Sequence, residues 1–466
     1  MSADPRVGMV VLATASYGSL DDREGGGGAV SRALARLAES LGWPLRGAGI
    51  FGRLVAPGAR VLVKPNWVMH ANHGPWGIEP LVTHASVIGA VVEELLRSRA
   101  GRVVVGDAPL QACDFAALLR ATGMDGWSEA QQVTDARFAG IRDFRRTTCE
   151  IRDGVRVPQV DRRPREDFIL FDLGTDSLLE QVTDERRSFR VTQYDPSQMV
   201  ATHGKGRHQY LVARDVIESD VIFNLPKLKT HKKAGLTCAL KNLIGINGNK
   251  EYLPHHRVGG AAVGGDCYPG RSPLKRALEY AFDRQHQATS HTGRQTWYQA
   301  TRVLNRLVRA SGDVLGVEGS WSGNDTLWRT CLDLNRIVLY GRPDGTLADS
   351  PQRAVFHIVD AIVAGQGDGP LAPQPLPLRR LFAGASAAAV DWVAARLLGY
   401  QPERIPIVRE AFGAFRWPIA GFSPDGIVPV CDGVSTSDDV FGPQTVPVTY
   451  PVGWRDAVIG LAAAYK

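Results

Sequence analysis

The sequence has few cysteines and no long apolar run. Its 6 cysteines are scattered, without the Cys-x-x-Cys pairs typical of zinc ribbons and iron-sulfur clusters. No apolar stretch reaches the roughly 18 residues of a membrane span, and the first residues lack the basic segment of a secretory signal. We therefore expect a cytoplasmic protein with thiols in a reducing compartment, no iron-sulfur cluster and no membrane span.

Several common nucleotide-binding and hydrolase motifs are also missing. The sequence has no Gly-x-x-x-x-Gly-Lys-[Ser/Thr] loop, no Gly-x-Gly-x-x-Gly turn and no Gly-x-Ser-x-Gly elbow. These absences argue against an NTPase, a nicotinamide dehydrogenase and a serine hydrolase. The net charge of +6 suits an anionic ligand, but the arginines are dispersed and lack interleaved aromatics, which argues against nucleic acid as a partner.

The chain of 466 residues is long enough to bury a large core, and its hydrophobic fraction of 44% is that of a globular protein. Apolar runs at 60–66 and 102–109 flank an amphipathic helix at 85–97, which predicts a β-loop-α-β unit and hence a parallel sheet. The same reading predicts further strands and helices, at 219–226, 236–246 (helix), 355–363, 380–386 and 387–398 (helix). The predicted fold is α/β, a mainly parallel sheet flanked by helices, with a β-rich and a helical insertion.

Changes in composition suggest how the chain is divided. The predicted parts are an N-terminal helix and loop at 1–58, an α/β core at 59–141 and 208–411, a β-rich lobe at 142–207, a helical insertion at 272–312 and a C-terminal extension at 412–466.

Polar residues follow four of the predicted strands. Ligands of parallel sheets bind beyond the carboxyl ends of the strands, so these residues are the first candidates for a site. They are Lys64 and Asn66; Asp107; Asn224, Lys227, Lys229 and His231; and Asp360 with the turn at 365–370.

The segment 224–249 is the richest of these. Lys227 and Lys229 share a face in extended chain and would attract a carboxylate or phosphate; neighbouring cations also lower a lysine's pKa, which allows nucleophilic roles. Lys241 and Asn242 interrupt an otherwise apolar helix, where an unpaired charge is costly to bury. The alternative is a solvated basic loop.

His231 is a candidate acid/base or metal ligand. His255, His256 and Asp266 lie on a glycine-rich loop able to fold toward it, and with Asp360 they form the candidate set for a divalent metal. No metal-binding spacing supports that set, and a surface loop explains it equally well.

Two further patches are candidates for substrate binding. Gly367 and Gly369 could present backbone N–H groups to an anion, or form a tight loop with no ligand. Asn324 and Asp325 stand between two tryptophans, as in a sugar-binding platform, although a helix N-cap is the favoured interpretation.

Six motifs together resemble domain of unknown function family 362. They include Leu-Val-Lys-Pro-Asn, Gly-Asp-Ala-Pro, Leu-Pro-Lys-Leu-Lys-Thr-His and Leu-Lys-Asn-Leu, and the resemblance spans about 60–411. Some relatives carry an appended ferredoxin-like domain, for which this chain lacks the cysteine spacing. The resemblance implies a role among bacterial polysaccharide or specialised-metabolite genes. Cys267, where an acidic residue is expected, and Gln366, where relatives tend to have glutamate, weaken a carboxylate-rich metal site.

We therefore expect an enzyme, an isomerase or group-transfer enzyme, acting on a small anionic or sugar-containing metabolite. Lys64, Lys227, Lys229 and Lys241 would bind the anion, with Lys229 and Lys241 also catalytic, and His231 would be the acid/base. Asp107 and Asp360 would orient His231 or hold a divalent cation, and Asn66 and Asn242 would fix the geometry. The alternative is a non-catalytic protein that binds an anionic ligand or serves in assembly.

Overall fold

The computed structural model describes residues 4–17, 28–153, 155–158, 161, 163–186, 188–192, 194–431, 434–435 and 447–458. Parts of the predicted segments 1–58 and 412–466 therefore lie outside the described residues. Within the described ranges, no helix combines the length and apolar character that crossing a membrane requires.

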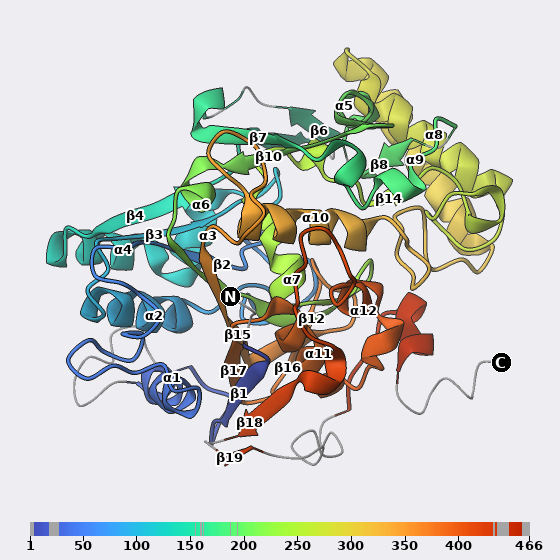
Figure 1. Cartoon of the computed structure of the whole chain (residues 1–466). Coiled ribbons are helices and arrows are strands. Elements are labelled where there is room, and N and C mark those ends of the chain that lie inside the picture. Colours follow the sequence, from blue (N-terminus) through green and yellow to red (C-terminus); the bar gives the residue numbers. More distant parts are fainter. Residues whose placement is uncertain are drawn as a thin grey trace.

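A large mixed sheet forms the centre of the molecule (Figure 1). Its strands follow the order β19-β18-β1-β17-β15-β11-β2-β3-β4, with β12, β13 and β16 attached on the β15 side. From β4 to β15 all neighbours are parallel. The bounds are β1 Arg6–Val11, β2 Arg60–Pro65, β3 Arg102–Asp107, β4 Phe138–Asp143, β11 Val221–Leu225, β12 Lys227–His231, β13 Gly235–Thr237, β15 Ala354–Gln366, β16 Gln374–Leu376, β17 Arg380–Gly384, β18 Val428–Cys431 and β19 Val434–Ser435.

The central strands are apolar on both faces because helices cover both. In β2, Val61 and Val63 belong to the core that includes α1 and α2, whereas Leu62 between them belongs to the core that includes α10 and the lobe. The helices are α1 Ala29–Ser40, α2 Ala85–Arg97, α3 Phe115–Thr122, α4 Met124–Thr134, α5 Pro196–Thr202, α6 Arg214–Ile217, α7 Ala239–Asn242, α8 Pro273–Gln287, α9 His291–Ala310, α10 Leu327–Tyr340, α11 Ala387–Leu397 and α12 Pro406–Glu410.

Two insertions, a β-rich lobe and a helical hairpin, extend from the main sheet and its helices. The lobe forms three small antiparallel sheets, β7-β10-β9, β5-β6 and β14-β8, in which β10 and β14 come from the segment predicted as core. Its strands are β5 Cys149–Arg152, β6 Val155–Pro158, β7 Phe168–Asp172, β8 Phe189–Arg190, β9 His203–Gly204, β10 Arg207–Ala213 and β14 His256–Arg257. Helices α8 and α9 form a hairpin beside the lobe, and Figure 1 shows it at the outer edge of the molecule. The predicted α/β fold with a β-rich and a helical insertion is confirmed.

Some predicted elements differ from the observed ones. The N-terminal segment contributes more than helix and loop, because β1 pairs with β17 and β18 inside the main sheet. The predicted helix 236–246 begins as strand β13, continues as α7 and ends as a 3-10 turn. Residues 227–231, expected as a strand end, form a strand of their own after Pro226, because Pro226 lacks the N–H group needed to continue β11.

Candidate ligand-binding site

Strand β12 carries the two lysines singled out in the sequence, and both are fully buried. It runs parallel to β15 with Lys227 opposite Asp360 and Lys229 opposite Gly365. The register shifts between these two pairs. The shift places the two lysines in different surroundings despite their spacing of two.

Lys227 lies in a closed polar cluster. Its Nζ lies 2.6 Å from Asp360 Oδ2 and donates to Tyr17 Oη (2.7 Å) and the Val363 carbonyl (3.1 Å). Tyr17 donates to Asp360 Oδ1 (2.8 Å), and the backbone N–H of His84 donates to Asp360 Oδ2 (3.0 Å). All three ammonium donors and both carboxylate oxygens are therefore used. Because both groups are occupied within the protein, these contacts do not support the predictions of Lys227 as a substrate ligand and Asp360 as a metal ligand.

Lys64 and Asp107 form a second buried ion pair. Lys64 Nζ lies 2.7 Å from Asp107 Oδ1, and the carboxylate also accepts from the backbone N–H groups of Trp67 (2.6 Å) and Ala108 (2.8 Å). A Cβ on Gly245 would lie 2.0 Å from Asp107 Oδ1, so only glycine fits there. Burial raises the pKa of Asp107 and lowers that of Lys64. Both charges are thus compensated within the protein, so these contacts do not by themselves support the predicted catalytic role of Asp107 or anion binding by Lys64.

Asparagines connect that pair to the segment 224–249. Asn242 Oδ1 accepts from Asn66 Nδ2 (2.9 Å), and Asn242 Nδ2 donates to Asn224 Oδ1 (2.7 Å). Lys64 Nζ also lies 3.4 Å from Asn242 Oδ1. The network joins the ends of β2 and β11 to α7.

A cavity of about 380 Å³ opens beside this network, and we call it the central cavity. Among the predicted site residues, Asn66, Asp107, Lys229, His231, Lys241, Asn242 and His255 line it. Its cationic lining residues are Arg156, Lys229, Lys232, Lys233, Lys241 and Lys250. The acidic lining residues, Asp107 and Glu318, are already paired with Lys64 and Lys232. The central cavity therefore favours an anion.

Buried polar atoms without partners also line the central cavity. Asn66 Oδ1, Trp67 Nε1 and Thr237 Oγ1 are buried and have no hydrogen-bond partner. Each such atom costs about 1–3 kcal/mol if it stays unpaired. A polar ligand in the central cavity could supply partners to an acceptor, a donor and a hydroxyl of this kind.

Lys229 and Lys241 place two amino groups at the central cavity. Burial, then the charges of Lys241 and Lys227, hold the pKa of Lys229 well below its usual range. Lys229 Nζ donates to the Leu81 carbonyl (2.5 Å). The pKa of Lys241 is lowered by burial, and no hydrogen bond or ion pair within the described part of the chain reaches its Nζ. Its lowered pKa makes Lys229 easier to deprotonate than an ordinary lysine.

His231 has its proton fixed by the backbone. Its Nδ1 accepts from the N–H groups of Lys233 (3.0 Å) and Ala234 (3.1 Å). Burial, followed by the charges of Lys241, Lys233 and Lys229, holds its pKa well below the usual range. The ring is therefore neutral with the proton on Nε2, which makes His231 a hydrogen-bond donor rather than a base.

The remaining predicted substrate ligands lie away from the central cavity. Asn324 Oδ1 accepts from the N–H groups of Thr326 and Leu327 at the start of α10, whose N-cap residue is Thr326. Asp325 pairs with Arg329. These contacts are those of a helix start, although neither predicted residue is the N-cap itself. The N–H of Gly367 donates to the Thr449 carbonyl, and that of Gly369 to the Gly367 carbonyl. These backbone groups are occupied, so they do not support the predicted anion site at Gly367 and Gly369.

The predicted metal set is not assembled either. Among the described residues, no group of three ligands combines His255, His256, Asp266 and Asp360. Asp266 accepts from Thr326 Oγ1 (2.6 Å) and the Asp325 N–H (3.1 Å), while His255 lines the central cavity. Of these two neighbouring histidines, His255 lines the central cavity and His256 does not.

Several lining residues were not predicted. Trp67 and Lys250 flank predicted residues in the sequence, and burial lowers the pKa of Lys250 to about 7. Thr237 lies in the predicted segment 224–249, but no local sequence pattern marks it as a lining residue. Arg156 and Glu318 come from the lobe and from the loop before α10, and only tertiary folding brings them here.

Fold and site together define an α/β protein with a buried cationic cavity at the carboxyl ends of parallel strands. The chain matches the family model described as "Domain of unknown function (DUF362)" over residues 61–162 and 171–396, and it belongs to that family.

Two individual proteins are similar to it. A protein of Synechocystis sp. (strain ATCC 27184 / PCC 6803 / Kazusa), called "Thylakoid-associated protein sll1697", is 24% identical over 370 residues, 79% of this chain and 72% of that protein. A crystal structure of a Thermotoga maritima protein from the Northeast Structural Genomics Consortium shares 11% identity at a TM-score of 0.31. That match covers 78% of this chain and 57% of the other.

Proposed function

We propose that the chain is an enzyme that binds a small anionic metabolite in the central cavity and moves a proton on it. The observation that carries this proposal is the coexistence, among the residues that line the central cavity, of several lysines, buried polar atoms without partners and an amine whose pKa is lowered. A purely structural cluster would pair these groups, as the Lys227 cluster does.

The residues divide into roles. Lys241 and Lys250 hold the carboxylate or phosphate of the ligand, because both reach the central cavity and Lys241 has no protein partner in the described ranges. Thr237 and Asn66 orient polar groups of the ligand. Lys229 accepts the proton, and His231 Nε2–H donates a hydrogen bond to the oxygen on which charge develops. Isomerisation is the reaction that this set serves most directly.

A first experiment measures binding and turnover separately. Sulfate binding by calorimetry reports on the anion site, since sulfate keeps its charge over the working pH range. Incubation with a bacterial metabolite extract in D2O, followed by mass spectrometry, reports deuterium incorporated into any metabolite. The proposal expects incorporation by the wild type, none by Lys229→Met, and wild-type behaviour of the exposed-lysine control Lys205→Met.

Two results would redirect the proposal. Sulfate binding without deuterium incorporation leaves the non-catalytic anion-binding alternative. A metabolite trapped on Lys229 by borohydride makes the amine a nucleophile rather than a base.

A further inference from the structure

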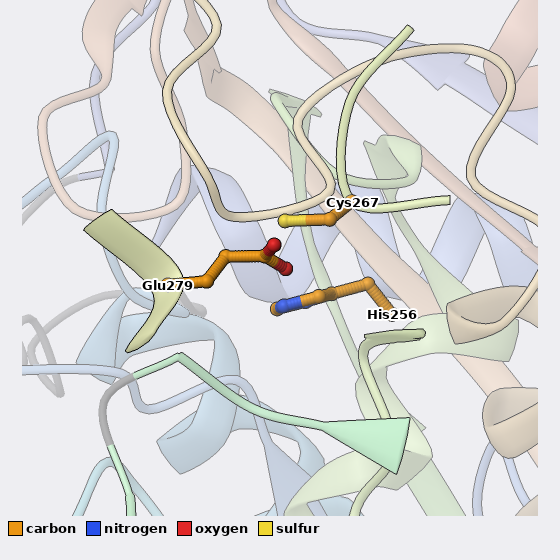
Figure 2. Close-up of side chains that lie close together, drawn as sticks. All are labelled: His256, Cys267 and Glu279. Carbon is orange, nitrogen blue, oxygen red and sulfur yellow. The ribbon is translucent and has the colours of Figure 1, made fainter. Parts of the chain in front are cut away.

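Three side chains outside the central cavity gather beneath the helical hairpin. His256 lies in β14, Cys267 in the loop that follows, and Glu279 in α8, as Figure 2 shows. One nitrogen, the sulfur and one carboxylate oxygen all lie within 4.8 Å of one another. Each residue is only 1% exposed. Three separate segments thus direct ligand atoms of three kinds toward one buried point.

The polar atoms at this point are incompletely used. His256 Nδ1 and Glu279 Oε2 are buried and have no hydrogen-bond partner. Glu279 Oε1 accepts from the Gly259 N–H (2.9 Å), and the half-exposed Arg276 lies 3.5 Å from Oε2. Arg276 therefore compensates the charge of Glu279 in part, whereas the imidazole nitrogen of His256 is left unpaired in the core, which is costly unless something else binds it.

The ligand types indicate which ion fits. A thiolate, an imidazole and a carboxylate suit Zn²⁺, whereas Mg²⁺ and Ca²⁺ require oxygen ligands. A catalytic Cys-His-Glu triad is the other use of such a set. It requires a substrate path to the sulfur, and none of the three residues lines the central cavity. The family resemblance led us to expect an acidic residue at position 267. A cysteine there replaces a carboxylate ligand by a sulfur ligand, and the position can still bind a metal ion.

We propose that His256, Cys267 and Glu279 bind a structural Zn²⁺, with water as the fourth ligand. Binding forms Zn–N, Zn–S and Zn–O bonds, and the thiol proton of Cys267 is released to solvent without any change of oxidation state. The ion joins β14 to α8 and so fixes the hairpin of α8 and α9 against the lobe. It also anchors the backbone next to His255, a residue of the central cavity wall.

The test uses full-length protein whose purification tag has been removed, because histidine tags bind zinc. Elemental analysis after dialysis against Zn²⁺ and then metal-free buffer is expected to find equimolar zinc in the wild type. Co²⁺ replacing Zn²⁺ is expected to give a sulfur-to-cobalt charge-transfer band and tetrahedral visible bands. Glu279→Gln keeps the Oε1 acceptor for Gly259, and Cys267→Ser removes the sulfur.

Both variants are expected to lower zinc affinity at least about 10-fold, as weakening a metal site typically does. Cys267→Ser is expected to lose the charge-transfer band, and Cys113→Ser, a buried thiol elsewhere, to keep it. Circular dichroism checks that the variants fold. A folded wild type that retains neither Zn²⁺ nor Co²⁺, or a cobalt band that survives Cys267→Ser, overturns the proposal and leaves a hydrogen-bonded core cluster. Either result leaves the sulfate and deuterium measurements unaffected.

Discussion

Lys227 and Lys229 lie two residues apart on one buried strand, yet they belong to different kinds of polar site. Every donor of Lys227 has a protein partner, and its cluster is closed. Lys229 faces a cavity with unpaired polar atoms and further lysines. A buried lysine therefore indicates a ligand-binding or catalytic role only when no neighbouring group compensates its charge. The Lys227 cluster should therefore govern stability, and the central cavity should govern binding.

The largest expected effect comes from breaking the Lys227 cluster. Lys227→Met leaves the Asp360 carboxylate buried without its cation, so the free energy of unfolding should fall by about 3–5 kcal/mol. Urea denaturation measures this loss. Asp360→Asn should produce a similar loss, because it leaves the Lys227 ammonium group buried without its carboxylate. A fall below about 1 kcal/mol in both variants would show that the cluster is not the structural element described here.

Lys241→Met tests the other side of the comparison. It removes a buried charge that has no protein partner in the described ranges, so the free energy of unfolding should not fall. Sulfate affinity should fall about 10-fold, which corresponds to about 1.4 kcal/mol. Calorimetry and urea denaturation of the same variant give both values. A variant that loses stability but keeps its sulfate affinity would assign Lys241 to the structural class.

The pH dependence sharpens the comparison through Lys250, whose pKa is about 7 in the folded protein and 10.5 ordinarily. Above pH 7 its amine loses the proton, so sulfate affinity should fall several-fold between pH 6 and pH 8. Between pH 7 and pH 10.5 Lys250 is protonated in the unfolded chain but not in the folded protein, so the unfolded chain binds more protons. The free energy of unfolding of the ligand-free protein should therefore rise with pH across this range. Lys250→Met should flatten the affinity profile; an unchanged profile contradicts the assignment.

The smallest effect is expected from a matched pair of threonines. Thr237 Oγ1 has no partner at the central cavity, whereas Thr230 Oγ1 donates to the Gly367 carbonyl (2.8 Å). Thr230→Val should lower stability by about 1 kcal/mol and leave sulfate binding unchanged. Thr237→Val should not lower stability, because it removes an unpaired buried hydroxyl, and it should weaken sulfate binding a few-fold. If the two variants change stability and sulfate affinity by the same amounts, the distinction between paired and unpaired hydroxyl groups does not predict their roles.

The sequence predicted the regular elements well where periodicity was strong. The helix expected at 85–97 is α2, Ala85–Arg97, because its apolar side chains recur at helical spacing and His84 caps it through Ser86. The strands expected near 60 and 102 are β2 and β3, since both are apolar on two faces. Local patterns of this kind are independent of distant residues.

Partner choice in the site was not predictable in the same way. Whether Lys227 or Lys229 is compensated depends on Tyr17, which is 210 residues from Lys227, and on the register between β12 and β15. His255 lines the central cavity whereas the next residue, His256, joins Cys267 and Glu279. Such facts arise from long-range packing, for which one sequence holds no local signal.

The place of β1 in the main sheet has a consequence for how the chain is made. Its sheet partners, β17 and β18, lie more than 360 residues later in the chain, so a growing chain carries β1 as an unsatisfied strand through most of translation. Exposed strand edges recruit other chains. Ribosome-bound intermediates shorter than about 380 residues should therefore depend on chaperones far more than the finished molecule does.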